Sequence, residues 1–240
     1  MNKHLILFAL AIAILLASCG DDALLDTELN IVASMNGQEL QFGQQYTTDQ
    51  DQGLYFTLFK LYLSELEIVD EAGVATSIAD VLLHDLENPE SYKVELEAGN
   101  YTQLRFGLGL DETLNQSDPN DFEVDHPLSY AQNTHWGWAS LYKFMMLEGR
   151  CSENAEDDLY NTTFAYHTGT DSLFRQLELP LNLEVEENGV NSIQLSINMD
   201  LLFGANAVNV VEENFSHSGI EELPLAIRIT DRMMEAFSVN

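Results

Sequence analysis

Apolar side chains alternate with polar ones along much of this chain, and short clusters of Gly, Asn and Asp interrupt the alternation. In Leu177–Glu186, for example, Leu or Val occupies every odd position from 177 to 185. A period of two puts one set of side chains on a buried face and the other in water, as in a β-strand. No long helical pattern intervenes between such runs. The chain is therefore predicted to be all-β, an antiparallel β-sandwich with a Greek-key-like arrangement and long loops.

Turn residues between these runs predict how some strands are connected. Hairpins are expected across Asn36-Gly37, Ala98-Gly99-Asn100 and Glu187-Asn188-Gly189. The last segment, 223–237, has Ile227, Thr230, Met233, Met234 and Phe237 at helical spacing and is predicted as a short C-terminal helix that caps the sheet. The predicted strands are Glu28–Met35, Glu39–Tyr46, Leu54–Val69, Val81–Leu86, Tyr92–Leu96, Tyr101–Leu110, Asn133–Arg150, Thr162–Gly169, Leu177–Glu186 and Asn191–Leu202.

The N-terminus has the features of a processing signal. Lys3 and His4 form a short polar head, an apolar run follows over Leu5–Leu15, and the box Leu16-Ala17-Ser18-Cys19 ends it. The run is too short to span a bilayer. The box resembles a bacterial lipoprotein signal, which implies cleavage before Cys19 and lipidation of its thiol; an ordinary secretory peptide is the alternative. We expect residues 1–18 to be the signal, 19–27 a lipidated acidic tether and 28–240 one β-sandwich domain.

The residues around Cys19 also predict where the protein resides. Asp21-Asp22 resembles the export signals that send some lipoproteins to the cell surface. We therefore expect a lipid-anchored protein of the outer membrane, on its periplasmic face or at the cell surface. With Cys19 lipidated, Cys151 is the remaining cysteine, so an intramolecular disulfide is excluded. Cys151 falls in the polar stretch 150–161 and is predicted to be a loop thiol.

The charge balance restricts the possible partners. The chain has 9 Lys and Arg against 40 Asp and Glu, a formal net charge of −31. Nucleic acid is excluded as a partner, because there is no basic stripe to displace phosphate counterions. Most of these carboxylates are expected to form a solvated acidic surface. A charged partner, if there is one, is expected to be a cation or a positively charged protein.

Both tryptophans of the chain lie in the segment Asn133–Arg150. Helical spacing fits part of this segment, but Gly137 and the density of aromatic residues favour a strand. Such a strand places Trp136, Trp138, Tyr142, Phe144 and Met146 on one face. Composition alone favours core packing for that face. The long polar connection Asp111–Gln132 that precedes it is predicted to fold over it as a lid.

The sequence contains no Gly-rich phosphate loop, no Ser-His-Asp motif and no His-Glu-x-x-His helix, so a binding protein is favoured over an enzyme. Among the histidines, His135 and His167 lie on predicted strands that are rich in aromatic residues. Neutral imidazoles beside a thioether or an indole suit copper better than calcium or magnesium. The histidines after the signal are His84, His126, His135, His167 and His217.

Several linked motifs in this order resemble the MbnP-like copper-binding domain family, which includes MbnP, CorA and MopE. The resemblance runs from about Leu29 to the C-terminus. Its motifs in this chain are Leu61-Tyr62-Leu63-Ser64, Leu83-His84-Asp85-Leu86, Ala98-Gly99-Asn100-Tyr101, Arg105–Asp111, Trp136-Gly137-Trp138, Tyr142-Lys143-Phe144, Leu147-Glu148-Gly149 and Phe164-Ala165-Tyr166-His167-Thr168-Gly169.

The resemblance implies an all-β extracytoplasmic protein that holds copper through two histidines and an oxidised tryptophan. His167 matches the histidine of the family's aromatic-His-x-Gly motif. Trp136 or Trp138 would be the residue converted to kynurenine, and a dihaem peroxidase-like cytochrome would be the partner that oxidises it. A positively charged face on that cytochrome would suit this acidic chain.

Two hypotheses follow from the sequence. In the first, the protein is a copper-binding lipoprotein whose site uses His135 and His167, with Met145 or His84 as further candidate ligands. In the second, it is a surface binding module without a metal, in which the tryptophan strand is core and the connection Asp111–Gln132 recognises a glycan or a protein. A copper-dependent rise in thermal stability would separate the two, because a ligand that binds only the folded state must stabilise it.

Overall fold

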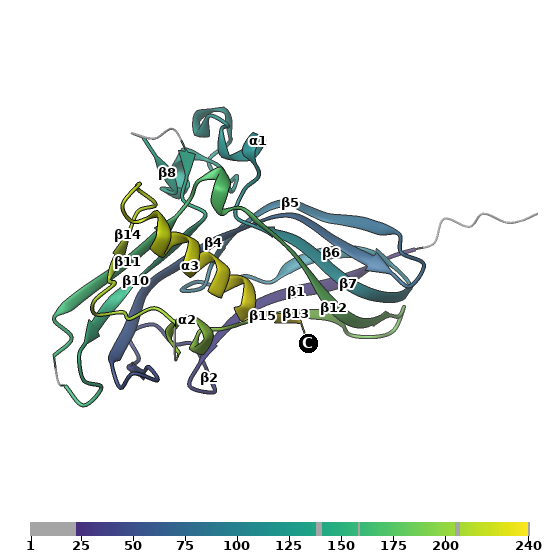
Figure 1. Ribbon diagram of the computed structural model, residues 1–240. Coiled ribbons are helices and arrows are strands. Elements are labelled where there is room, and N and C mark those ends of the chain that lie inside the picture. Colours follow the sequence, from purple (N-terminus) through teal and green to yellow (C-terminus); the bar gives the residue numbers. More distant parts are fainter. Residues whose placement is uncertain (1–22, 138–140, 158, 205–206, 240) are drawn as a thin grey trace, which may run out of the picture.

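The computed structural model describes residues 23–137, 141–157, 159–204 and 207–239, and within these ranges the chain forms two main sheets that pack as a sandwich (Figure 1). The predicted β-sandwich with a short C-terminal helix is thus confirmed. Most strand pairs are antiparallel, but β1 pairs with β13, and β11 with β14, in parallel, so both sheets are mixed. The signal, Cys19 and Trp138 lie outside the described residues.

The elements have the following bounds. One sheet contains β1 (Leu24–Met35), β2 (Gln38–Glu39), β6 (Tyr92–Glu97), β13 (Asn191–Asn198) and β15 (Phe237–Val239). The larger sheet contains β3 (Tyr46–Thr47), β4 (Gly53–Asp70), β5 (Ala75–Asp85), β7 (Gly99–Leu108), β10 (Met145–Ser152), β11 (Thr162–Thr168), β12 (Arg175–Val185) and β14 (Phe215–Ser216). A small ladder joins β8 (His135–Trp136) to β9 (Leu141–Tyr142), and the helices are α1 (Glu112–Asn115), η1 (Pro119–Asp121), η2 (Tyr130–Gln132), η3 (Asp171–Leu173), α2 (Asp200–Phe203) and α3 (Leu223–Ala236).

Strand β4 organises the larger sheet, because its two halves have different neighbours. β10 pairs with the half from Gly53 to Leu61, and β7 pairs with the half from Leu63 to Asp70. The change occurs at Tyr62, whose N–H donates to Phe144 O at 2.8 Å and whose C=O accepts from Gly109 N at 2.9 Å. The sheet therefore has two wings, one with β10, β11 and β14 and the other with β5, β7 and β12, which lie to the left and right in Figure 1.

A bulge in β4 reverses the predicted alternation of its side chains. Glu65 has a positive φ of 51°, and the register with β7 shifts between Ser64 and Glu67. The extra residue moves the buried positions by one, so that Leu63 and Leu66 both reach the main core. An unbroken alternation would place Leu63, Glu65, Glu67 and Val69 on one face, and the bulge ends that alternation after Leu63.

The hydrophobic core has two parts. The main cluster lies between the sheets and includes the fully buried rings of Phe56, Phe59, Phe106 and Phe164. A second cluster forms where the two wings of the larger sheet separate, and it contains Tyr62, Leu110, Leu128, Tyr142, Phe144, Leu173 and Ala226. Burial of large aromatic and aliphatic side chains on this scale supplies the main stabilising free energy of the fold.

Of the three predicted hairpins, one is confirmed. Asn36 and Gly37 have φ values of 52° and 71°, as a tight hairpin turn requires, and β1 pairs with β2 across them. The other two are wrong, because β6 and β13 pair with β1 whereas β7 and β12 pair with each other in the larger sheet. Alternation specifies the inward face of a strand, and both sheets of a sandwich face the same core. The same pattern therefore fits a hairpin and a link between sheets.

The predicted single strand Asn133–Arg150 is wrong in its first half. β8 and β9 pair with each other, His135 opposite Tyr142 and Trp136 opposite Leu141, and only β10 continues into the larger sheet. Cys151 is also misplaced by the prediction, since it lies in β10 and is fully buried. The polar residues next to it in the sequence indicate a loop, but the alternation of β10 points its side chain into the core.

The predicted ends of several elements need correction. β1 begins at Leu24, so residues 24–27, assigned to the tether, belong to the strand. The segment Glu39–Tyr46 contributes only the ends of β2 and β3. Helix α3 is confirmed, but it buries Ala226, Ile229, Thr230, Met233 and Ala236, while Ile227 is exposed. Among the described residues, no helix is long and apolar enough to cross a membrane.

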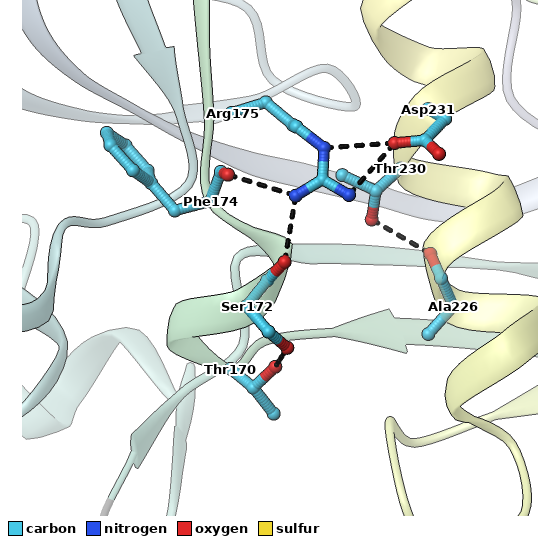
Figure 2. A network of polar contacts seen from close by, with 7 residues as sticks. All are labelled: Thr170, Ser172, Phe174, Arg175, Ala226, Thr230 and Asp231. Carbon is cyan, nitrogen blue, oxygen red and sulfur yellow. Dashed lines mark hydrogen bonds and ion pairs between the residues drawn. The ribbon is translucent and has the colours of Figure 1, made fainter.

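Arg175 fastens helix α3 to the turn η3 (Figure 2). Its Nε and Nη2 each lie 2.9 Å from Asp231 Oδ1 on the helix. Its Nη1 donates to Ser172 O at 2.8 Å and to Phe174 O at 3.0 Å. Because η3 directly follows β11, these contacts hold the helix against the end of the strand that carries His167.

Candidate functional site

A row of side chains crosses the outer face of the larger sheet at the junction of its wings. Asp85 of β5 stands opposite Lys60 of β4, Lys60 opposite Met146 of β10, and Met146 opposite His167 of β11. Directly opposed residues of neighbouring strands lie on the same face, so these four side chains are adjacent in turn. Lys60 and Asp85 form an ion pair at 3.0 Å. Met146 and His167 are 7% and 8% exposed, and they form the nearly buried end of the row.

The two ring nitrogens of His167 have different surroundings. Nε2 lies 2.7 Å from Glu148 Oε1. Nδ1 is buried and has no hydrogen-bond partner within the described structure. A buried polar atom without a partner is uncommon in a folded protein and calls for an explanation, for which a bound ion is one candidate.

His217 is a site residue that the sequence pattern does not indicate. It follows β14, and its ring stacks on that of His167 with centroids 4.6 Å apart and planes 5° from parallel. Ser218 Oγ donates to His167 O at 3.1 Å and fixes the segment there. His217 lies in a polar stretch without strand alternation, so only its being a histidine could have suggested it.

Burial is the main influence on both histidines. It lowers the pKa of His167 and of His217, and nearby Lys143 acts in the same direction on each. Glu148 opposes this change by favouring the charged imidazole. Because the pKa values lie below the usual value for histidine, both rings are neutral at neutral pH, which is the form that binds metals.

Trp136 lies beside the strand end that carries His167. A Cβ added to Gly169 would lie 2.2 Å from Tyr142 O and 3.0 Å from Trp136 Cζ3. A Cβ added to Gly149 would lie 2.1 Å from Tyr55 O. The glycines of the Leu-Glu-Gly and His-x-Gly motifs are therefore sites where backbone and aromatic side chains approach too closely for any larger residue.

The connection Asp111–Gln132 covers the β8–β9 ladder, as predicted for its position. Tyr142 OH donates to Leu128 O at 2.8 Å, and Tyr62 OH donates to Pro127 O at 2.7 Å. Asn115, fully buried, accepts from Tyr142 N at 2.9 Å and donates to Asp171 Oδ1 at 2.7 Å. Buried hydrogen bonds of this kind join the connection firmly to the second core cluster.

Of the other predicted ligands, His135 and His84 lie in different surroundings from His167. His135 contacts Tyr142 edge-on, with ring centroids 4.9 Å apart, and lines a cleft of about 400 Å³ together with Asp118 and Tyr130. His135 therefore lies against the Asp111–Gln132 connection. His84 is fully buried, with Nε2 3.1 Å from Ile31 O and Nδ1 3.0 Å from Tyr92 OH. Both of its nitrogens are used, so His84 is a structural histidine.

Met145, the methionine predicted as a candidate ligand, does not lie beside His167 on the outer face. It stands opposite Thr168 and belongs to the main core, whereas Met146 faces outward beside His167. Successive residues of a strand point to opposite faces, so an error of one position moves a side chain through the sheet. The methionine that can reach a ligand on His167 is therefore Met146.

The donors beside His167 fit a soft metal ion better than a hard one. Within the described ranges, no three or more His, Cys, Asp or Glu side chains are grouped so that they could hold a metal. The available set is the buried Nδ1 of His167, the Met146 thioether and the half-buried His217. Imidazole lone pairs lie in the ring plane, so the stacked His217 must turn before both rings can bind one ion. Neutral nitrogen and sulfur donors suit copper.

The fold and site define an all-β sandwich protein with a stacked histidine pair at one end of its larger sheet. The family model for MbnP matches residues 25–220, so the chain belongs to the MbnP family. The solved structure of MbnP from Methylosinus trichosporium superposes with a TM-score of 0.55 at 16% identity, covering 90% of this chain and 98% of that one. At this identity the likeness shows a shared fold. No curated protein matches the chain.

Proposed function

We propose that this protein binds copper and that His167 is its anchoring ligand. The observation that carries the proposal is the buried Nδ1 of His167, which has no hydrogen-bond partner among the described residues while Nε2 contacts Glu148. Membership of the MbnP family supports a copper-related role. A bound ion would use the lone pair that the fold otherwise leaves buried without a partner.

Met146 and His217 are the other residues that would hold the ion. Met146 is opposite His167 in the β10–β11 ladder, and the ring of His217 is already in contact with that of His167. Two imidazoles and a thioether form a neutral, soft donor set, which favours copper over calcium or magnesium. The proposed role is copper binding rather than catalysis.

The first experiment compares copper affinity in paired variants of the soluble domain. His167→Ala is expected to abolish tight copper binding while the domain remains folded, and His135→Ala is expected to retain it. Met146→Leu should weaken binding, whereas Met145→Leu, one residue away on the opposite face, should leave it unchanged. Undiminished affinity in His167→Ala would contradict the proposal.

The oxidation of a tryptophan is the second part of the proposal. Trp136 lies beside Gly169, two residues from His167, and Trp138 is the alternative target. A haem-based oxidant on a dihaem cytochrome partner would cleave the indole ring, and its C2 would leave as formate. The kynurenine that remains has one more oxygen and one fewer carbon than tryptophan. An intact-mass spectrum of protein from its native host should then show an increase of about 4 Da in the peptide that contains both tryptophans. An unmodified peptide would exclude this part.

The anchor is the third part, and it predicts lipid on Cys19 at the outer membrane. The sequence box Leu16-Ala17-Ser18-Cys19 supports it. In a Cys19→Ser variant the protein should be released from the membrane fraction into the soluble extract. Retention of that variant in the membrane would refute the anchor without affecting the copper proposal.

A second candidate function is a surface binding module without a metal. A cleft of about 510 Å³ favours it, because the end of the Asp111–Gln132 connection forms one wall and polar residues of β4 and β5 form the other. Carboxylate and amide groups around an aromatic ring suit a hydroxyl-rich ligand such as a glycan. The lining includes Lys60, Asp85, Asn88, Glu90, Tyr92, Asp125 and Gln132. Metal-free purified protein whose thermal midpoint is indifferent to copper would favour this function.

A further inference from the structure

The contact between Glu148 and His167 determines which nitrogen of the imidazole is available. At neutral pH a carboxylate accepts hydrogen bonds and donates none, so the 2.7 Å contact requires a proton on Nε2 of His167. A neutral imidazole carries one proton, and Nδ1 is then left with a free lone pair. The opposite tautomer would bury an N–H at Nδ1 without an acceptor and direct the lone pair of Nε2 at a negative charge.

The sheet fixes this contact. β10 lies between β4 and β11, and Glu148 stands opposite Ala165, two residues from His167 on the same face. The Glu148 side chain is 36% exposed and that of His167 is 11% exposed. The carboxylate thus reaches the ring from the solvent side, while its backbone is fixed by ladders on both sides.

We propose that Glu148 is a positioning residue that makes Nδ1 the ligand atom of His167, an inference that rests on the proposed copper binding. Glu148 acts through the imidazole and does not touch the ion. A cation on Nδ1 withdraws electron density from the ring and makes the Nε2–H a stronger donor to the carboxylate. Acidic partners of this kind raise the basicity of metal-bound histidines, and their loss costs about 10- to 100-fold in metal affinity.

The other charged groups near the ring do not provide this effect. Among the described residues whose charge acts on His167, Lys143 and His217 disfavour a positive charge on the ring and Glu148 favours it. The next carboxylate along the row, Asp85, is paired with Lys60 at 3.0 Å. Glu148 is therefore the group that fixes the tautomer and compensates the charge of the bound ion.

The test begins with metal-free protein and needs no copper. Long-range proton–nitrogen NMR correlations of histidine side chains, recorded at about pH 8 where imidazoles are neutral, should show the proton of His167 on Nε2. Glu148→Gln keeps an acceptor oxygen and should keep that tautomer. Glu148→Leu removes the acceptor, so the Nε2–H tautomer of His167 should no longer be favoured. The matched control is Glu178→Leu, which removes a strand carboxylate paired with Arg105 elsewhere on the sheet. It should change neither the tautomer of His167 nor the copper affinity.

Copper titrations of the same proteins complete the test. Affinity should fall about 10- to 100-fold in Glu148→Leu and less in Glu148→Gln. A proton on Nδ1 in the wild-type protein, or an unchanged tautomer in Glu148→Leu, would overturn the role of Glu148 even if copper binds. The expected tautomer in a protein that binds no copper would instead overturn the copper function and leave Glu148 as the residue that orients His167.

Discussion

Replacing Gly169 by alanine tests the close packing behind His167. The added Cβ would lie 2.2 Å from Tyr142 O, 3.0 Å from Lys143 Cα and 3.0 Å from Trp136 Cζ3. Two of these atoms belong to the backbone of the neighbouring segment, so they cannot move aside as a flexible side chain would. Gly169 does not have a positive φ, and the cost is therefore steric rather than conformational. Overpacking of this kind costs about 1–3 kcal/mol.

The measurement is the free energy of unfolding from urea titrations, with thermal melting as a second readout. For a domain of this size, about 1–3 kcal/mol lowers the midpoint by roughly 2–12 °C. Gly137→Ala is the control, because a Cβ there meets no heavy atom of the described residues within 4 Å. It should change stability by no more than about 0.5 kcal/mol. Equal losses in the two variants would refute the steric argument.

Three further predictions concern stability and reactivity. Burial lowers the pKa of His84, so the unfolded chain binds the proton more readily than the folded protein does. The contribution of His84 to stability should be complete above about pH 6.5 and decline below it, by at most about 1.4 kcal/mol per pH unit. His84→Phe should reduce that slope in urea titrations at two pH values. Burial raises the pKa of the Cys151 thiol to about 11, so in a Cys19→Ser protein an alkylating reagent at about pH 8 should label Cys151 only after unfolding, and rapid labelling of folded protein would contradict its burial. Arg175→Ala removes two carbonyl contacts as well as the pair with Asp231 and should cost about 1–2 kcal/mol, against less than about 1 kcal/mol for Asp231→Ala; the reverse order in thermal melts would show that the carbonyl contacts contribute little.

The alternation of apolar residues predicted most strands but not which sheet each strand joins. β11 and β12 lie where the pattern places them, and within β11 the alternating residues Phe164 and Tyr166 face the core. The link after β6 and the link after β12 look like hairpins in sequence because both carry Gly and Asn. Such turn residues are compatible with a hairpin and with a link between the two sheets. Packing between residues far apart in the chain determines which of the two forms.

The candidate site could be predicted only in part. The motif around His167 points to that residue, but the sequence does not distinguish Met145 from Met146, because a shift of one residue changes the face of a strand. His217 could not be found, because it reaches His167 through the parallel pairing of β14 with β11, which no local pattern encodes. His84 has a motif of its own, and its two hydrogen bonds show that this motif serves the core.

The parallel pairing of β1 with β13 has a consequence for how the molecule forms. β1 is a central strand near the start of the chain, and its partner β13 is made only after most of the sequence has been synthesised. Until residue 198 is available, one edge of β1 has no hydrogen-bonding partner, and long-range strand pairing of this kind is slow. The sandwich therefore cannot close in stages from its N-terminus. In a growing chain, β1 can pair with β2 and β6 on one edge, but its other edge stays exposed until the last quarter of the protein arrives.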